Sequence, residues 1–162
     1  FEAGGYIFLK NKKISLIMDV GSSPEKKFSK DYQCGALSFE IISNDKKLIC
    51  NSGYFQKMKH KLNEISKSSA NHSTLIIDNH SSCKINKSKI ETSLKILSKK
   101  LIAEKDYWKI SASHDGYIKR YGVICSGTKT NSSSSTRSRM LLNSEVTPPA
   151  VDLDTSRSPH SL

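Results

Sequence analysis

Apolar residues recur at every second position in short segments over the first 125 residues, and polar turns separate these segments. In the stretch KISLIMDV, the residues Ile14, Leu16, Met18 and Val20 share one phase of this alternation. A period of two is typical of a β-strand with one buried face. The strand-like stretch GYIFLKNKK precedes it and contains an Asn-Lys turn, so the sequence predicts a β-hairpin over residues 5–20.

A second hairpin of similar size is predicted over residues 36–55. The stretches ALSFEIIS and LICNSGYF supply its strands, and NDKK supplies its turn. The polar, lysine-rich residues 56–71 predict a long loop. The stretch STLIID, residues 73–78, then predicts another short, buried strand.

Residues 89–102 fit two patterns. Their apolar residues suit one face of a helix, and the alternation from Ile90 to Ile96 equally suits one face of a strand. The strand is favoured because the neighbouring segments are strands.

The stretches YWKISAS and GYIKRYGVIC predict one more antiparallel pair, with Asp115 and Gly116 in the turn between them. Successive short strands without intervening helices are typical of antiparallel sandwiches. The predicted fold class is therefore all-β: an antiparallel β-sandwich over residues 1–125, as part of a larger sandwich domain.

The composition changes abruptly at Ser126. Residues 126–162 contain no aromatic residue, ten serines and three of the four prolines. Such a segment buries too little apolar surface to offset the entropy of ordering, so a disordered, low-complexity tail is predicted. A frameshift or a cloning junction also produces a change of this kind, which would make residues 126–162 non-native.

Charge and cysteine usage narrow the classes of partner. Lys and Arg outnumber Asp and Glu by 26 to 15, a net charge of +11, which suits an acidic polysaccharide, an anionic membrane face or nucleic acid. No lysine cluster alternates with aromatic residues, so nucleic acid is not the expected partner. No apolar run is long enough to span a membrane. The four cysteines lack the spacing of metal ligands; two of them could pair in an oxidising compartment, without the sequence showing which.

Several stretches occur in the order and spacing of a known family over residues 4–124: GGYIFL, LIMDVG, ALSFEI, KKLICNSG, SSANHSTLIIDN and ASHDGYIKRYGVI. Together they resemble the C-terminal β-sandwich region of the heparinase II/III-like polysaccharide lyases. The stretches NHSSCKI and CNSG look most like those of alphaproteobacterial members. The resemblance implies that the chain is a fragment of a longer protein.

The resemblance also implies a reaction and partners. Members of the family cleave uronic-acid polysaccharides by β-elimination, in an active site between an N-terminal α/α toroid and the sandwich. We therefore expect an acidic polysaccharide as substrate and the toroid of the same protein as partner. The expected location is the periplasm or cell envelope.

In the family, two histidines and an aspartate of the sandwich bind a structural metal, and the matching residues here are Gln33, Asn51 and His72. A neutral amide is a poorer zinc ligand than an imidazole or a carboxylate. We therefore expect no cofactor, zinc being the one candidate, and a hydrogen-bonded trio around His72 instead.

A catalytic histidine of the family's sandwich precedes the first metal ligand by two residues, and Asp31 occupies this position. Asp31 could act as a base, although a solvated loop aspartate is the simpler interpretation. His114 and Tyr117 could line a sugar site, with Tyr117 stacking on the ring; alternatively, they flank a hairpin turn and pack in the sheet.

Two functions follow from these residues. The chain is the sandwich part of a lyase, inactive without its toroid, or it is a non-catalytic carbohydrate-binding or structural module that has lost the metal and catalytic residues. A nucleic-acid-binding β-domain rests on charge alone.

Overall fold

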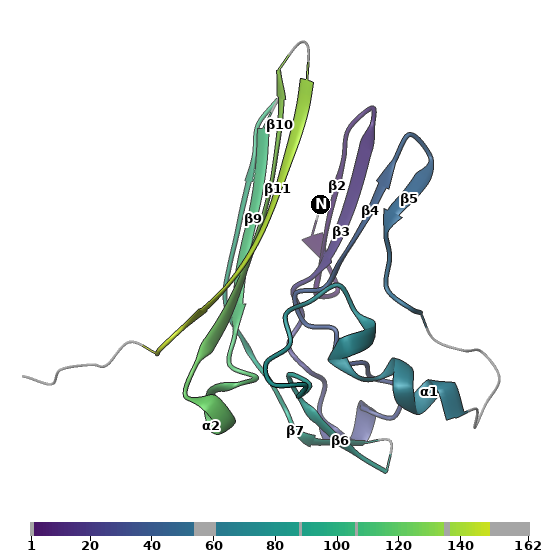
Figure 1. Cartoon of the computed structure of the whole chain (residues 1–162), viewed down its shortest axis with the longest axis vertical. Coiled ribbons are helices and arrows are strands. Elements are labelled where there is room, and N and C mark those ends of the chain that lie inside the picture. Colours follow the sequence, from purple (N-terminus) through teal and green to yellow (C-terminus); the bar gives the residue numbers. More distant parts are fainter. Residues whose placement is uncertain (1, 54–60, 88, 106, 135–136, 150–162) are drawn as a thin grey trace, which may run out of the picture.

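The computed structural model of the chain describes residues 2–53, 61–87, 89–105, 107–134 and 137–149. Two antiparallel sheets face each other in it (Figure 1). The first sheet has the order β1 (Glu2–Ala3), β2 (Tyr6–Lys10), β3 (Ile14–Asp19), β4 (Phe39–Ser43) and β5 (Lys46–Ile49). The second has the order β11 (Arg137–Thr147), β10 (Ile124–Ser134), β9 (Tyr107–His114) and β8 (Ile96–Ala103). The predicted all-β, antiparallel sandwich is confirmed.

Both predicted N-terminal hairpins form, and asparagine shapes each turn. The last strand of the second hairpin ends at Ile49, and residues 54–55 of that prediction lie outside the described residues. Between β2 and β3, the Asn11 side chain accepts hydrogen bonds from the backbone N–H groups of Lys13 and Ile14 (2.9 and 2.7 Å). Between β4 and β5, Asn44 and Asp45 both have positive φ angles of 46° and 63°. Two such residues in succession form the hairpin turn that matches the natural twist of the strands.

The main core lies between the two sheets. Alternate residues of β2, β3 and β4 point inward and meet the inward-facing residues of β9. The buried members of this core are Ile7, Leu16, Met18, Val20, Leu37, Ile41, Trp108, Ile110 and Ala112. A smaller cluster of Cys34, Ala36, Cys83 and Leu94 lies apart from it. A disulfide joins Cys34 to Cys83 within this smaller cluster, which answers the pairing question that the sequence left open.

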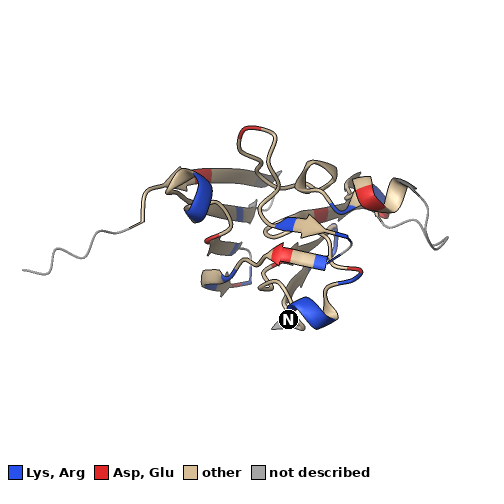
Figure 2. Cartoon of the chain, turned by 90° about the horizontal axis from the view of Figure 1, so that it is seen from below, with Lys and Arg blue, Asp and Glu red and all other residues tan. Residues whose placement is uncertain are grey.

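Short elements cover one end of the sandwich, at the bottom of Figure 1. They are η1 (Lys26–Phe28), α1 (Lys61–Ser66), η2 (Ser69–Asn71), the β6 (Lys84–Asn86) and β7 (Lys89–Thr92) hairpin, and α2 (Ile118–Tyr121). Seen from that end, segments of Lys or Arg and segments of Asp or Glu are interspersed along the ribbon (Figure 2). None of the described helices is long and apolar enough to cross a membrane.

Two predictions for residues 56–78 change. Residues 73–78 form a loop with one bridge, Ile77 to His80, because the hydroxyls of Ser73 and Thr74 bond the carbonyls of Phe39 and Ala36 in place of a strand ladder. The predicted loop over residues 56–71 contains α1 and η2 in its described part.

The prediction for the stretch GYIKRYGVIC is half wrong. Its first part, Ile118–Tyr121, forms the helical turn α2, which ends at Gly122 in the left-handed conformation (φ 64°). Only Cys125 and the residues after it pair with β9. Residues 89–102 are strands, as favoured, but two of them, β7 and β8.

The sheet continues past residue 125. β10 pairs with β9 and with β11, so residues 126–134 and 137–147 are strands, which differs from the disordered tail expected from Ser126. Serine and threonine side chains add little to an apolar core, but their backbone groups still form hydrogen bonds with neighbouring strands. Gly127 packs closely on Leu37 and Met18 of the core. Residues 150–162 lie outside the described part of the chain, and whether the tail is native stays a prediction.

Candidate functional site

The best-supported site lies on the outer face of the first sheet. Two neighbouring cavities of about 320 and 240 Å³ share Tyr6, Asp19, Ser38 and Asn51 in their walls. Tyr6 and Asp19 stand opposite each other on β2 and β3, and alternation directs them away from the core that Ile7 and Met18 enter. We call these two cavities together the sheet-face groove.

The structure brings together the residues that the sequence singled out as a degenerate metal site. Asp31, Gln33, Asn51 and His72 all line the smaller cavity of the groove. They come from the loop before β4, the segment after β5 and the segment after η2. Asp31 is exposed at this site, whereas the other three residues are half-buried.

His72 has one ring nitrogen committed and one without a partner. Its Nε2 lies 3.1 Å from the backbone carbonyl oxygen of Ser66. A carbonyl oxygen only accepts, so Nε2 carries the proton of the neutral ring and Nδ1 holds a lone pair. Nδ1 is buried and has no hydrogen-bond partner. Burial lowers the pKa of His72, which favours this neutral form.

Gly35 makes room for the imidazole. A Cβ atom at residue 35 would lie 3.2 Å from Nδ1 of His72 and 3.2 Å from Oγ of Ser38. Any larger residue would therefore crowd the ring, so the glycine fixes how closely His72 approaches the loop that carries Gln33.

Both the oxygen and the nitrogen of the Asn51 side-chain amide form hydrogen bonds with neighbouring residues. Its Oδ1 accepts hydrogen bonds from the N–H and Oγ of Ser73 (2.9 and 3.1 Å), and its Nδ2 donates to Oγ of Ser38 (3.4 Å). The side-chain hydrogen bonds of Asn51 and His72 thus run to serines and to a carbonyl. They do not join the predicted trio to one another among the described residues.

The donor set does not fit zinc. One imidazole nitrogen and two neutral amides differ from the Cys, His and carboxylate sets of protein zinc sites, and the oxygen of Asn51 is already occupied. In the described part of the chain, no group of three or more His, Cys, Asp or Glu side chains could hold a metal ion.

The sequence reasoning missed Asp19. It ends β3, half-buried, and its Oδ1 accepts the N–H of Gly21 at 2.9 Å. Burial raises the pKa of this carboxyl from 3.8 to about 6, although the bond from Gly21 opposes the shift. A carboxylate with a pKa near neutrality in a groove is a candidate acid or base. An aspartate on the outward phase of a strand, two residues before a glycine, was the available signal.

Tyrosines complete the groove. Tyr32 has a buried hydroxyl without a hydrogen-bond partner. Burial, followed by the nearby Asp19 and Tyr6, raises the pKa of Tyr32. Asp19, followed by burial, raises the pKa of Tyr6 as well. Two of the three buried side-chain atoms without partners in the described residues, Tyr32 Oη and His72 Nδ1, therefore belong to residues that line this groove.

His114 and Tyr117 lie inside the protein, with 1% of each residue exposed. His114 Nδ1 accepts the N–H of Gly116 (3.1 Å), and burial lowers the pKa of His114 to about 4. Tyr117 donates its hydroxyl to the carbonyl of His80 (2.8 Å) and borders a different pocket. The structure does not bring either residue to the sheet-face groove.

Comparison with known proteins gives one match. The model of the family described as heparinase II/III-like, C-terminal, matches residues 1–128. No match was found among curated proteins or among solved structures. The matched range contains every residue of the sheet-face groove.

Proposed function

The chain belongs to the heparinase II/III-like, C-terminal family, and from this premise we propose that it forms the β-sandwich wall of a polysaccharide lyase. The proposed substrates are acidic polysaccharides, cleaved at uronic-acid residues by β-elimination. The observation that carries the proposal is the convergence of Asp19, Tyr32, Gln33 and His72 on one groove within the matched region.

The groove offers groups suited to this reaction. In β-elimination, a base removes the proton on the carbon next to the uronate carboxylate, the bond to the leaving oxygen breaks, and an acid returns a proton to that oxygen. The lone pair of His72 Nδ1 is a base without a competing partner. Asp19 carries its proton below about pH 6 and loses it above, so it suits either role.

A second domain would complete the site. The sheet face beside the groove exposes large apolar side chains at Phe8, Ile17 and Ile42, between 38% and 40% exposed. Register places Phe8 opposite Ile17, so these residues share one face with Tyr6 and Asp19. Apolar residues gathered beside a groove favour coverage by another protein surface, and we assign that surface to an N-terminal toroid of the same protein.

The disulfide supports a location outside the cytosol. Disulfides persist in oxidising compartments, and Cys34–Cys83 joins segments that are 49 residues apart. We therefore propose the periplasm or cell envelope.

The test uses the complete parent protein with uronate polysaccharides, following the ultraviolet absorbance of the unsaturated product. We expect turnover, and a fall in kcat of about 100-fold or more in His72→Ala and Asp19→Asn, the loss typical for a general acid or base. Asp45→Asn, in the exposed β4–β5 turn, is the matched control. Absence of product from every acidic glycan would reject the lyase.

A non-catalytic carbohydrate-binding module is the second candidate. It is favoured by the commitment of Asn51 to Ser73 and Ser38, which leaves its amide no free acceptor for a metal. Glycan binding by the parent protein that persists without any product would establish this alternative.

A further inference from the structure

A second, larger pocket lies at the end of the sandwich where the short elements gather. It has a volume of about 550 Å³, and its walls come from residues 79–85, from Thr92 of β7 and from the start and body of α2. Pockets of this size suit small-molecule ligands or single units of a polymer. We call it the α2 pocket; it shares no residue with the sheet-face groove.

The charge of the α2 pocket is positive. Lys84, Lys119 and Arg120 line it, and none of the described lining residues is acidic. Lys84 has a carboxylate partner, Glu91, at 3.1 Å. Among the described residues, no carboxylate lies within ion-pair distance of Arg120.

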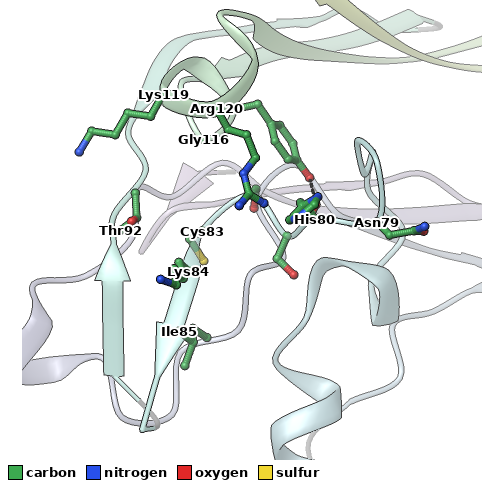
Figure 3. Close-up of a pocket in the computed structure, with 12 residues that line it drawn as sticks. Asn79, His80, Cys83, Lys84, Ile85, Thr92, Gly116, Lys119 and Arg120 are labelled. Atoms are coloured by element: carbon green, nitrogen blue, oxygen red, sulfur yellow. Dashed lines mark hydrogen bonds between the residues drawn. The ribbon is translucent and has the colours of Figure 1, made fainter.

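Arg120 is the cation that faces the pocket. Its side chain extends from α2 into the space between the strand that carries Lys84 and the loop that carries His80, whereas Lys119 points away from the centre (Figure 3). A guanidinium is planar and presents paired N–H donors, the geometry that matches a carboxylate or a sulfate.

The floor of the pocket is held in place before any ligand arrives. The disulfide fixes Cys83. The N–H of Ser82 donates to Oγ of Ser69 (3.0 Å), and the N–H of Ser69 donates to Oγ of Ser81 (3.0 Å). A preformed site loses less entropy on binding.

Close packing of α2 against this floor positions Arg120. A Cβ atom at residue 116 would overlap the backbone carbonyl oxygen of Ser82, so only glycine permits the contact. Tyr117 then donates to the carbonyl of His80 (2.8 Å). Both contacts lie directly before the helical turn that carries Arg120.

We propose that the α2 pocket is an anion-binding subsite for the acidic group, carboxylate or sulfate, of a saccharide unit, with Arg120 as its charged contact. The proposal rests on the proposed function for the choice of a saccharide, and it adds a second site that shares no residue with the sheet-face groove. Hydroxyl groups of Thr92 and Ser81 and the imidazole of His80 line the same pocket and provide hydrogen-bonding partners for sugar hydroxyls.

The experiment is calorimetric titration of the 162-residue chain with hexagalacturonate, a carboxylated probe, and with a heparin hexasaccharide, a sulfated probe. Neutral cellohexaose is the uncharged control. We expect binding of one or both acidic probes, weakened about tenfold or more in Arg120→Gln, because hydrogen bonds to a charged group are the strong ones. Arg120→Lys should recover part of the affinity. Lys46→Gln, an exposed residue of β5, removes the same charge elsewhere and should change little.

Several results would overturn the subsite. They are equal affinity of wild type and Arg120→Gln, equal binding of cellohexaose, or preference for a single-stranded oligonucleotide of the same charge at the same salt. Arg120 is exposed, so its variants should melt like wild type, and circular dichroism checks this.

Failures of the two proposals are distinguishable. Binding that depends on His72 but not on Arg120 would reject the α2 pocket and leave the lyase proposal standing. Binding that depends on Arg120, in a parent protein that forms no unsaturated product, would reject the lyase and leave the subsite standing.

Discussion

Asp19 stands directly opposite Tyr6 on neighbouring antiparallel strands, and both side chains line the sheet-face groove. The partner of this carboxyl is therefore a phenol and not a cation. Burial raises the pKa of Asp19 to about 6, and the negative charge of Asp19 raises the pKa of Tyr6. A cost in stability follows, because the folded protein must hold a charge that water would solvate better.

Asp19→Asn should therefore stabilise the protein above pH 6. The carboxyl has a pKa of 3.8 when unfolded and about 6 when folded, so between these values the folded state binds more protons and stability falls as pH rises. At about 1.4 kcal/mol per pKa unit, the cost at neutral pH is about 3 kcal/mol. Urea denaturation from pH 4 to pH 8 measures it as the difference between variant and wild type.

Asp45→Asn is the control for that series, since it removes an exposed carboxylate from the β4–β5 turn and leaves the groove intact. A difference between Asp19→Asn and wild type that stays constant from pH 4 to pH 8 would contradict the raised pKa of Asp19.

Zinc binding should be absent in the wild type and recoverable by design. Gln33→His combined with Asn51→Asp provides two ligand types that zinc prefers, in the cavity that His72 also lines. We expect calorimetry to show tight binding of a single zinc ion by this double variant and none by the wild type.

Adding His72→Ala to the double variant should abolish the zinc binding, because it removes the nitrogen donor. Tight zinc binding by the wild-type chain would overturn the conclusion that the present donor set does not fit the metal.

The disulfide should contribute strongly to stability. The disulfide closes a loop between Cys34 and Cys83, which are 49 residues apart. This loop lowers the entropy of the unfolded chain and so raises the free energy of unfolding by about 4 kcal/mol. Cys34→Ser combined with Cys83→Ser should lower the free energy of unfolding by an amount of that order in urea titrations. Cys50→Ser, at an exposed free cysteine, should be near neutral. Equal stability of the double variant and the wild type would contradict a disulfide.

The strands that the sequence predicted correctly are those whose signals are local. Leu16 and Met18 share the buried phase of an apolar–polar alternation, and Asn44 and Asp45 form a turn. Each signal depends on a few neighbouring residues, and both hairpins formed. The strand predicted for residues 73–78 did not form, because the hydroxyls of Ser73 and Thr74 donate to carbonyl oxygens of β4 and of the loop at Ala36. No local sequence pattern shows these distant partners.

Long-range pairing explains what the sequence missed at the sites. The partner of Cys34 and the burial of Asp19 depend on chain folding far away in sequence. Gln33, Asn51 and His72, which the resemblance singled out, line one cavity, but their side-chain hydrogen bonds run to other residues. It said nothing of Arg120, whose place follows from the contact between Gly116 and Ser82.

Lys129 offers the sharpest test of the inter-sheet packing. It is 2% exposed on β10, with Nζ 4.6 Å from the ring centre of Phe39 and 3.4 Å from the carbonyl oxygen of Asn143. Burial lowers the pKa of Lys129, so the charged form is disfavoured in the folded protein. Lys129→Met keeps the length of the side chain without the charge and should raise the free energy of unfolding at pH 7 by about 1–3 kcal/mol.

The pH dependence separates charge from packing. The pKa of Lys129 is 10.5 when unfolded and lower when folded, so between these values the unfolded state binds more protons and wild-type stability rises with pH. The advantage of Lys129→Met should shrink accordingly as pH approaches 10.5. Lys100→Met, an exposed residue of β8, should show neither the gain nor the pH dependence. A Lys129→Met variant less stable than wild type at pH 7 would mean that the contacts with Phe39 and Asn143 outweigh the cost of burying the ammonium group.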